Sequence, residues 1–324
     1  MKDKFIEMSN DEYHSHDALG SSDVRKIMIS PLHFEGREEP AKRPNYFTFG
    51  SAAHCAYLEP EKFVERYRRK PLEVDGKGPR TNYYKEWIEE QKGVEWLSPD
   101  DFDKVVEVVA SAHSRSISSE MFRSPHVVEG SLFFKMRGVE CKARPDLVSF
   151  AGEDKVDVLD LKTTIDASPD GFRRKAVGQN KLFVQEWFYR KALEEAGLEV
   201  RRFIFLAVEK QAPFAAASYT LDQEQVGEAE EMVANALDAF KSSKESGVFE
   251  GYPDKVVELS VPQWCMPRKL LAMNGNWLTV KQAITAFSVS RATLYNWMAR
   301  GLESRRIGGK RFISASSLVN LQSK

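Results

Sequence analysis

The sequence has few cysteines and no long apolar run, and each shortage excludes a class of protein. Its three cysteines, Cys55, Cys141 and Cys265, are widely separated, which excludes a disulfide framework and any site built from four cysteines. We expect them to be reduced thiols. No apolar run approaches the roughly 18 residues that a membrane-spanning helix needs. The N-terminal residues lack the apolar stretch of a secretion signal. We therefore expect a cytoplasmic protein with no membrane partner.

The chain also lacks a strong net charge, but its charge is unevenly distributed. The total is −1. Residues 274–324 contain eight Lys or Arg residues and one acid, Glu303, so this segment carries +7 and the rest of the chain carries −8. A basic terminal segment on an acidic body predicts local attraction to phosphate, not coating by nucleic acid along the whole chain.

The length and the hydrophobic patterning predict two domains. We expect residues 1–268 and 277–324 to fold separately, joined by a linker at 269–276 that shows no pattern. Prolines interrupt small helices across 20–64. Residues 66–85 are predicted to form a loop that either follows a phosphate backbone or is ordinary solvated surface. The other predicted elements are helices at 100–122, 179–196 and 222–246 and strands at 131–136, 139–149, 156–163, 201–209 and 215–221. Short turns join the first three strands, which predicts an antiparallel meander within a mixed α/β fold.

The strand at 156–163 carries the most informative residues. Side chains alternate along a strand, so Asp160 and Lys162 share one face about 7 Å apart. Asp146, on the preceding strand, can lie opposite them. Two convergent carboxylates need a cation, and oxygen ligands select Mg²⁺ or Mn²⁺. A simple ion pair between Asp160 and Lys162 is the alternative, although the apolar neighbours predict a buried strand, where an acid needs a reason.

Two further segments offer candidate polar groups. Gln185 and Tyr189 are four residues apart and share a helix face, where they either grip substrate or pack in the core. His54 lies in a run of small residues, Gly50-Ser-Ala-Ala-His54, that lets a helix approach another element closely. A lone histidine there is more often a hydrogen-bonded core residue than a ligand.

Taken together, these segments resemble the RecE-type domain of the restriction-endonuclease-like PD-(D/E)xK superfamily, which also includes RecB-type nucleases. The resemblance covers residues from about 19 to 263. It implies a mixed sheet flanked by helices. The matching motifs, in the family's order, are Leu19-Gly-Ser-Ser-Asp with Ser30-Pro31, Phe49-Gly-Ser-Ala-Ala-His54 with Leu58-Glu-Pro60, Arg144-Pro-Asp146, Asp160-Leu-Lys-Thr-Thr164 and Gln185-xxx-Tyr189.

The resemblance implies a role for each matching position. His54, Asp146 and Asp160 would ligate Mg²⁺ or Mn²⁺ with the carbonyl of Leu161. Lys162 would be the catalytic lysine, acting with Asp146 and Asp160. The implied substrate-binding residues are Gln185, Tyr189 and Arg144, and Glu129 would be an accessory acid. Relatives with an iron–sulfur cluster need four cysteines, which this chain does not have.

The C-terminal segment is predicted to be a winged helix-turn-helix. Thr279 and Ser290 are suitable N-caps for two short helices separated by a turn at Val289-Ser290, and Gly308-Gly309 suits a two-residue hairpin turn. The segment resembles the DNA-binding domains of excisionase and MerR-type proteins. A module that binds protein or dimerises is the alternative, but the charge of +7 favours DNA. The predicted DNA-binding residues are Arg291, Thr293, Tyr295, Arg305, Arg306, Lys310 and Arg311.

The resemblance implies a deoxyribonuclease that degrades the 5′ strand at double-stranded DNA ends for recombination. Such an enzyme would form a homo-oligomer and work with a single-strand annealing recombinase. The C-terminal segment departs from the simplest relatives, so a sequence-directed or structure-directed endonuclease is the second hypothesis. A DNA-binding regulator that uses the nuclease fold as a scaffold is the third, and the intact set of Asp146, Asp160 and Lys162 weighs against it.

Overall fold

The computed structural model describes residues 2–37, 46–71, 82, 86–87, 89, 94–260, 277–287 and 289–322. The chain divides into two compact units, Met1–Tyr252 and Pro253–Lys324. The predicted linker at 269–276 lies outside the described residues, and the domain boundaries given above stay predictions. No helix of the described residues is both long enough and apolar enough to cross a bilayer.

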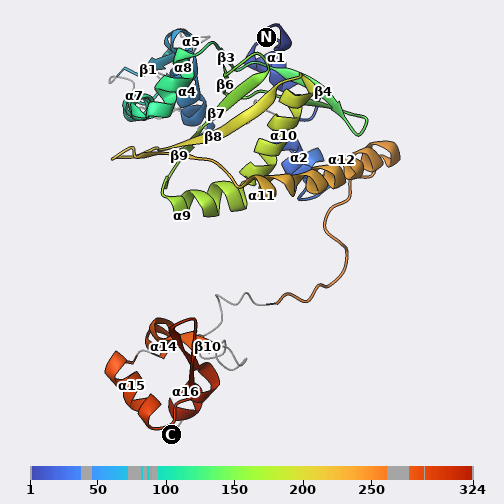
Figure 1. The fold of residues 1–324 in the computed structure, drawn as a ribbon. Coiled ribbons are helices and arrows are strands. Elements are labelled where there is room, and N and C mark those ends of the chain that lie inside the picture. Colours follow the sequence, from blue (N-terminus) through green and yellow to red (C-terminus); the bar gives the residue numbers. More distant parts are fainter. Residues whose placement is uncertain are drawn as a thin grey trace. The chain divides into compact units, whose positions relative to one another are not determined.

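A five-stranded mixed sheet forms the centre of the first unit (Figure 1). Its strands lie in the order β3 (His126–Val128), β6 (Leu147–Phe150), β7 (Lys155–Thr164), β8 (Glu199–Glu209) and β9 (Ala216–Tyr219). Only β7 and β8 run parallel, and the other neighbours are antiparallel. The predicted mixed α/β architecture is therefore confirmed.

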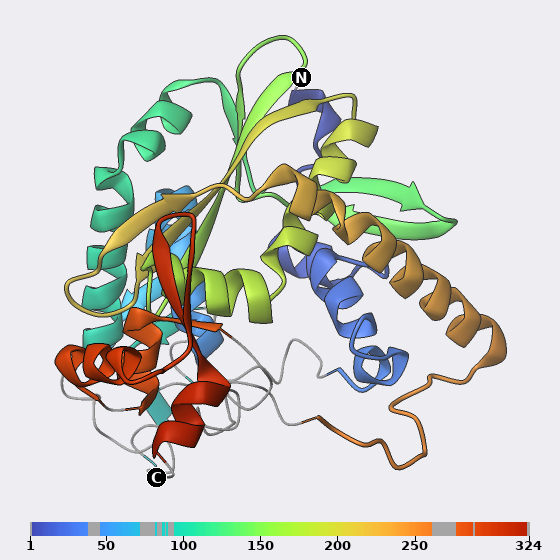
Figure 2. The same ribbon diagram turned by 60° about the horizontal axis from the view of Figure 1, so that its bottom comes forward.

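Helices cover both faces of this sheet (Figures 1 and 2). One face carries α4 (Tyr46–Leu58), α7 (Pro99–Ser114) and α8 (Ser116–Arg123), and the other carries α2 (Ser21–Ile27), α10 (Leu182–Glu195) and α12 (Ala229–Ser246). The alternation of β7 explains this arrangement. Val156 and Val158 belong to the core on the α10 face, whereas Leu159 and Leu161 belong to the core on the α4 face.

The predicted three-stranded meander is wrong, because the strand expected at 139–149 is two strands. β4 (Leu132–Met136) and β5 (Val139–Ala143) form a separate antiparallel hairpin, and β6 begins only at Leu147. The break falls at Arg144-Pro145-Asp146. Proline has no N–H to donate to a ladder, so the strand ends there and the chain enters a second sheet. Both predicted turns still join antiparallel neighbours, β4 with β5 and β6 with β7, but the two pairs belong to different sheets.

The helices differ from their predicted bounds mainly at breaks. The helix expected at 179–196 begins at Leu182, after α9 (Pro169–Phe172) and a π-helical segment, Arg173–Gln179, and it ends before Gly197, which has φ +70°. α11 (Gln223–Gly227) precedes α12, so the predicted single helix at 222–246 is also divided. Ser98 caps α7 as predicted.

Short elements complete the first unit. They are a 3₁₀ turn (Lys2–Lys4), α1 (Asn10–Ser15), α3 (Pro31–Glu35), α5 (Pro60–Arg66), β1 (Tyr67–Arg69) and β2 (Glu95–Leu97). Within the loop predicted at 66–85, β1 pairs with β2 in parallel. Residues 72–81 and 83–85 of that loop lie outside the described residues.

The second unit has the predicted helix-turn-helix and wing. Its elements are β10 (Trp277–Thr279), α14 (Val280–Phe287), α15 (Arg291–Ala299), β11 (Ser304–Ile307), β12 (Lys310–Ser314) and α16 (Ala315–Gln322). Ser290 caps α15 by accepting a hydrogen bond from the Thr293 N–H at 3.0 Å. Gly308 and Gly309 both have positive φ in the hairpin turn. The sequence pattern did not predict α16 or the pairing of β10 with β12.

Candidate functional site

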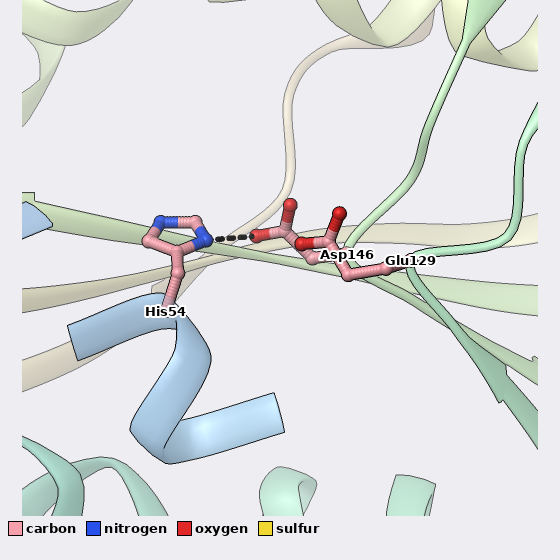
Figure 3. Close-up of side chains that lie close together, drawn as sticks. All are labelled: His54, Glu129 and Asp146. Carbon is pink, nitrogen blue, oxygen red and sulfur yellow. Dashed lines mark ion pairs between the residues drawn. The ribbon is translucent and has the colours of Figure 1, made fainter. Parts of the chain in front are cut away.

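Three potential metal ligands converge at one edge of the sheet (Figure 3). They are His54 of α4, Glu129 just after β3 and Asp146 just before β6, and one ligand atom from each lies within 4.8 Å of the others. The His54 Nδ1 atom is 3.3 Å from Asp146 Oδ2. Segments far apart in the sequence therefore supply an imidazole and two carboxylates to one point.

The small residues around His54 explain how α4 reaches this edge. Ala52 and Ala53 are fully buried in the core that α4 shares with Leu159 and Leu161 of β7. Side chains no larger than methyl let the helix lie close to the strand, as the sequence predicted. Glu129 adopts φ +50°, and its N–H donates to the Asp146 carbonyl at 3.0 Å. This hydrogen bond joins the two segments that carry the carboxylates.

Asp160 and Lys162 lie next to this group. Leu147 of β6 pairs with Leu159 of β7, and one more antiparallel step along the same register brings Asp146 opposite Asp160. The Leu161 N–H donates to Asp146 Oδ2 at 2.7 Å. The structure thus brings the carboxylates of both strands to the same end of the sheet.

The Asp160 carboxylate is fully buried and held from two sides. The Lys162 ammonium contacts its Oδ1, and Gln185 Nε2 donates to its Oδ2 at 2.8 Å. Asp160 is not one of the three residues that meet within 4.8 Å, whereas Glu129, expected only as an accessory acid, is. The ligand roles of both residues stay predictions.

The electrostatics of the group favour a bound cation. Burial, followed by repulsion from Asp146, raises the pKa of Glu129 to about 8. Burial also raises the pKa of Asp160 to about 7; Asp146 adds to this rise and Lys162 opposes it. Burial is the largest cause of both shifts and repulsion from Asp146 adds to each, so a cation bound among these carboxyl groups would lower their pKa values.

His54 has the opposite shift. Burial lowers the pKa of its imidazole, although Asp146 and a hydrogen bond to the Leu161 backbone both raise it. A neutral imidazole and two carboxylates form a donor set that fits a divalent cation such as Mn²⁺ or Mg²⁺.

The group opens into a cavity of about 1150 Å³. Tyr189 lines this cavity, and burial raises the pKa of its phenol well above the ordinary value. Residues 7–11, 13 and 14 form another part of the lining. No sequence pattern predicted this part, because nothing in residues 7–14 suggests that they lie near Asp146.

Arg144 also lines the cavity, but its guanidinium is largely occupied. Its Nε and Nη2 atoms donate to Ser131 Oγ at 2.9 and 2.7 Å, and Nη2 reaches the carbonyls of Met8 and Ser9 at 3.3 and 3.4 Å. The Tyr13 ring covers it at 4.1 Å. These contacts tie the N-terminal residues to the segments that carry Glu129 and Asp146. The predicted role of Arg144 in substrate binding stays a prediction.

In the second unit, two of the predicted DNA-binding arginines lie near the exposed ring of a third predicted residue, Tyr295. The guanidinium carbons of Arg291 and Arg311 both lie 5.9 Å from the centre of the Tyr295 ring. Thr293 instead hydrogen-bonds the N-cap residue Ser290, and Arg305 stacks 4.0 Å over Trp277. Arg306 and Lys310 are exposed on the two strands of the wing.

Comparisons with solved structures support the fold. A protein from Eubacterium rectale, described as a "putative exonuclease", is 14% identical in sequence. The alignment covers 79% of this chain and 97% of that protein, with a TM-score of 0.52. A protein from Vibrio cholerae is 10% identical over 71% of this chain and 57% of its own, with a TM-score of 0.21, too low to bear on the fold.

Comparisons of sequence identify the family. No curated protein matches the chain significantly. Residues 277–324 match a family model described as a helix-turn-helix domain. Residues 26–256 match the model described as a PDDEXK-like domain of unknown function, DUF3799. Because this second match spans well over half of the chain, the protein belongs to the DUF3799 family of PDDEXK-like domains and carries a helix-turn-helix domain at its C-terminus.

Proposed function

We propose that the protein is a metal-dependent deoxyribonuclease, and that it acts as a RecE-like exonuclease on the ends of double-stranded DNA. One observation carries the proposal: Asp146 joins His54 and Glu129 on one side to Asp160 and Lys162 on the other. A cation held by this group would lie beside a lysine that a carboxylate contacts on a buried strand. The family match supports a nuclease.

The residues suit the hydrolysis of a phosphodiester. His54, Glu129 and Asp146 would hold Mg²⁺ or Mn²⁺, with the Leu161 carbonyl and with Asp160 across the sheet. The ion would lower the pKa of a water molecule and stabilise charge on the phosphate. Asp160 orients the Lys162 ammonium, and Gln185 fixes the other oxygen of Asp160. Lys162 would then orient the attacking water and exchange a proton with it.

Resemblance supports the finer parts of the proposal. RecE-like enzymes degrade the 5′ strand and work beside a single-strand annealing recombinase, so we propose the same polarity, a role in recombination and a homo-oligomer. The Eubacterium rectale protein of similar fold is itself described as an exonuclease candidate. The helix-turn-helix domain would add affinity for DNA through Arg291, Tyr295 and Arg311.

The same helix-turn-helix domain favours a second candidate, a sequence-directed or structure-directed endonuclease. A domain that reads the major groove gives an enzyme a way to find internal sites. A non-catalytic regulator is the weaker alternative, since a scaffold would have no chemical need for the Asp146, Asp160 and Lys162 set.

Cleavage of end-labelled DNA tests the proposal. Linear duplexes labelled at either end are incubated with Mg²⁺ or Mn²⁺, and nicked and circular duplexes are treated in the same way. We expect the wild type to shorten linear DNA from the 5′ end and Lys162→Ala to bind DNA without cleaving it. Lys155→Ala is the matched control, because Lys155 lies on the same strand at its exposed far end, near Glu199. Equal cleavage by wild type and Lys162→Ala would refute the assigned role. Cleavage of circular DNA would favour the endonuclease.

A further inference from the structure

One wall of the cavity carries three hydrogen-bond donors that the proposed hydrolysis does not use. They are Ser51 of α4, Thr163 of β7 and Lys210 at the end of β8. We propose that these three residues form a phosphate-binding site that holds the DNA strand beside the metal ligands. This inference rests on the proposed function, because it names how the same cavity grips its substrate.

The fold brings the three donors together. Thr163 pairs with Val208 across the parallel strands β7 and β8, and the Lys210 N–H donates to the Thr164 carbonyl at 2.9 Å. Thr163 and Lys210 therefore lie at the ends of neighbouring strands. α4 passes close to them, because a Cβ added to Gly50 would lie 3.8 Å from Thr163 Oγ1. Ser51 precedes His54 by three residues, almost one helical turn. The donors therefore lie next to the proposed metal ligands.

Within the described ranges, the three donors have no acceptor in the protein. No hydrogen bond or ion pair is formed there by the Ser51 hydroxyl, the Thr163 hydroxyl or the Lys210 ammonium. Other cations of the same cavity are already paired. Lys62 lies 2.5 Å from Glu59, and Arg66 donates to Glu95 at 2.6 Å.

Lys210 in particular stands where an anion would relieve its environment. Its ammonium lies 5.8 Å from the centre of the Phe49 ring, and burial, followed by repulsion from Lys175, lowers its pKa. A half-buried ammonium beside a second cation gains from a negative partner. A phosphodiester suits this role, because its two non-bridging oxygens share one negative charge and can accept from an ammonium and two hydroxyls at once.

Neutralising one phosphate at a time tests the contact directly. Single methylphosphonate linkages, which carry no charge, are placed along a DNA substrate, and cleavage is measured for wild type and Lys210→Gln. Losing a hydrogen bond to a charged group should raise KM about tenfold or more, with a smaller effect on kcat. At the linkage whose phosphate Lys210 contacts, the methylphosphonate should slow cleavage by the wild type. The same substitution should not slow cleavage by Lys210→Gln further. Equal penalties at every linkage would overturn the phosphate-binding site.

Lys241→Gln is the matched control. Lys241 is also half-buried, but it lies on α12, outside the cavity lining. The Lys241→Gln variant should cleave every methylphosphonate substrate as the wild type does. Lys210→Arg, which keeps the charge, should restore most of the affinity that Lys210→Gln loses.

A second readout does not need cleavage. The full-length protein is acetylated with and without a short single-stranded oligonucleotide, and modified lysines are identified by mass spectrometry. The oligonucleotide should protect Lys210 and leave Lys241 unprotected. Protection of Lys210 in a protein that cleaves no DNA would reject the proposed hydrolysis and keep the phosphate-binding site. Normal cleavage with an unprotected Lys210 would do the reverse.

Discussion

Glu129 offers the sharpest test of the candidate metal site, because its charge costs stability until a cation binds. Burial and Asp146 raise its pKa from 4.5 to about 8. When folding raises the pKa of a carboxyl group, the neutral, protonated group contributes stability to the folded state. This contribution is complete below about pH 4.5 and is lost as the pH rises through about 8. Glu129→Gln, which removes the charge and keeps the shape, should therefore make the metal-free protein more stable at high pH.

The size of the effect follows from the shift. Each pKa unit corresponds to about 1.4 kcal/mol, so a fully buried group would cost about 5 kcal/mol at high pH. The Glu129 side chain is partly exposed, and solvent screening reduces the cost to about 2 kcal/mol. At about pH 9 the free energy of unfolding of Glu129→Gln should therefore be about 2 kcal/mol higher than that of the wild type. The difference should vanish near about pH 4.5.

Calorimetry with a chelator, at several pH values, measures this difference. Glu107→Gln is the control, because Glu107 is exposed on α7 and outside the cavity, and it should show no such trend. Adding Mn²⁺ or Mg²⁺ should reverse the order, since the wild type gains a ligand that the variant lacks. The affinity of the wild type for the cation should rise about tenfold per pH unit between about pH 7 and pH 8, because binding displaces the Glu129 proton, and more steeply below about pH 7, where Asp160 is protonated too. Equal stability of the two proteins at high pH, or the same pH dependence of cation binding in both, would refute the reasoning.

Three other perturbations have defined outcomes. Gln185→Leu leaves one oxygen of the buried Asp160 without its donor, which should lower the free energy of unfolding in urea by about 1–3 kcal/mol and slow DNA cleavage; an unchanged midpoint would contradict the contact. Arg144→Lys loses the Nη2 group that reaches the carbonyls of Met8 and Ser9, so limited proteolysis should cut the N-terminal residues sooner than in wild type, and equal protection would contradict this. Deleting 274–324 should weaken DNA binding and flatten its dependence on salt while cleavage persists; loss of cleavage on every substrate would reject the domain division.

Strand β7 shows how much of the site can be predicted from sequence. The alternation around Asp160 and Lys162 assigns both to one face, and the apolar neighbours predict that both faces are buried. The short turn at 151–154 then fixes an antiparallel partner for β7, which is why Asp146 could be expected opposite Asp160. These features depend on residues close together in the chain.

Other features of the site depend on contacts between distant residues. The Arg144 guanidinium reaches the carbonyls of Met8 and Ser9, which are more than 130 residues away, and no periodicity reports such a contact. The same holds for Glu129, whose positive φ and hydrogen bond to Asp146 bring it among the ligands. The break at Pro145 could have been anticipated, since a proline inside a predicted strand is a warning that the strand ends.

The helix-turn-helix was the easier prediction, because its signals are local. Two N-caps and a pair of glycines mark its elements, and the structure has each of them. α16 (Ala315–Gln322) was missed although it has similar local signals: Ser314 Oγ accepts from the Ser317 N–H at 3.3 Å, and Ala315 and Leu318 are buried three residues apart.

The two proposed sites in the cavity have opposite electrostatic needs, and this bears on what the cavity binds. Around Asp146, carboxyl groups outnumber the one ammonium that contacts them, so a bound cation would lower their raised pKa values. Near Thr163, the ammonium of Lys210 is half-buried and is repelled by Lys175, so an anion would stabilise it. A neutral substrate would satisfy neither need, and a cationic substrate would satisfy only the carboxyl groups. A divalent cation together with a polyanionic strand would satisfy both, which is the combination that phosphodiester hydrolysis requires.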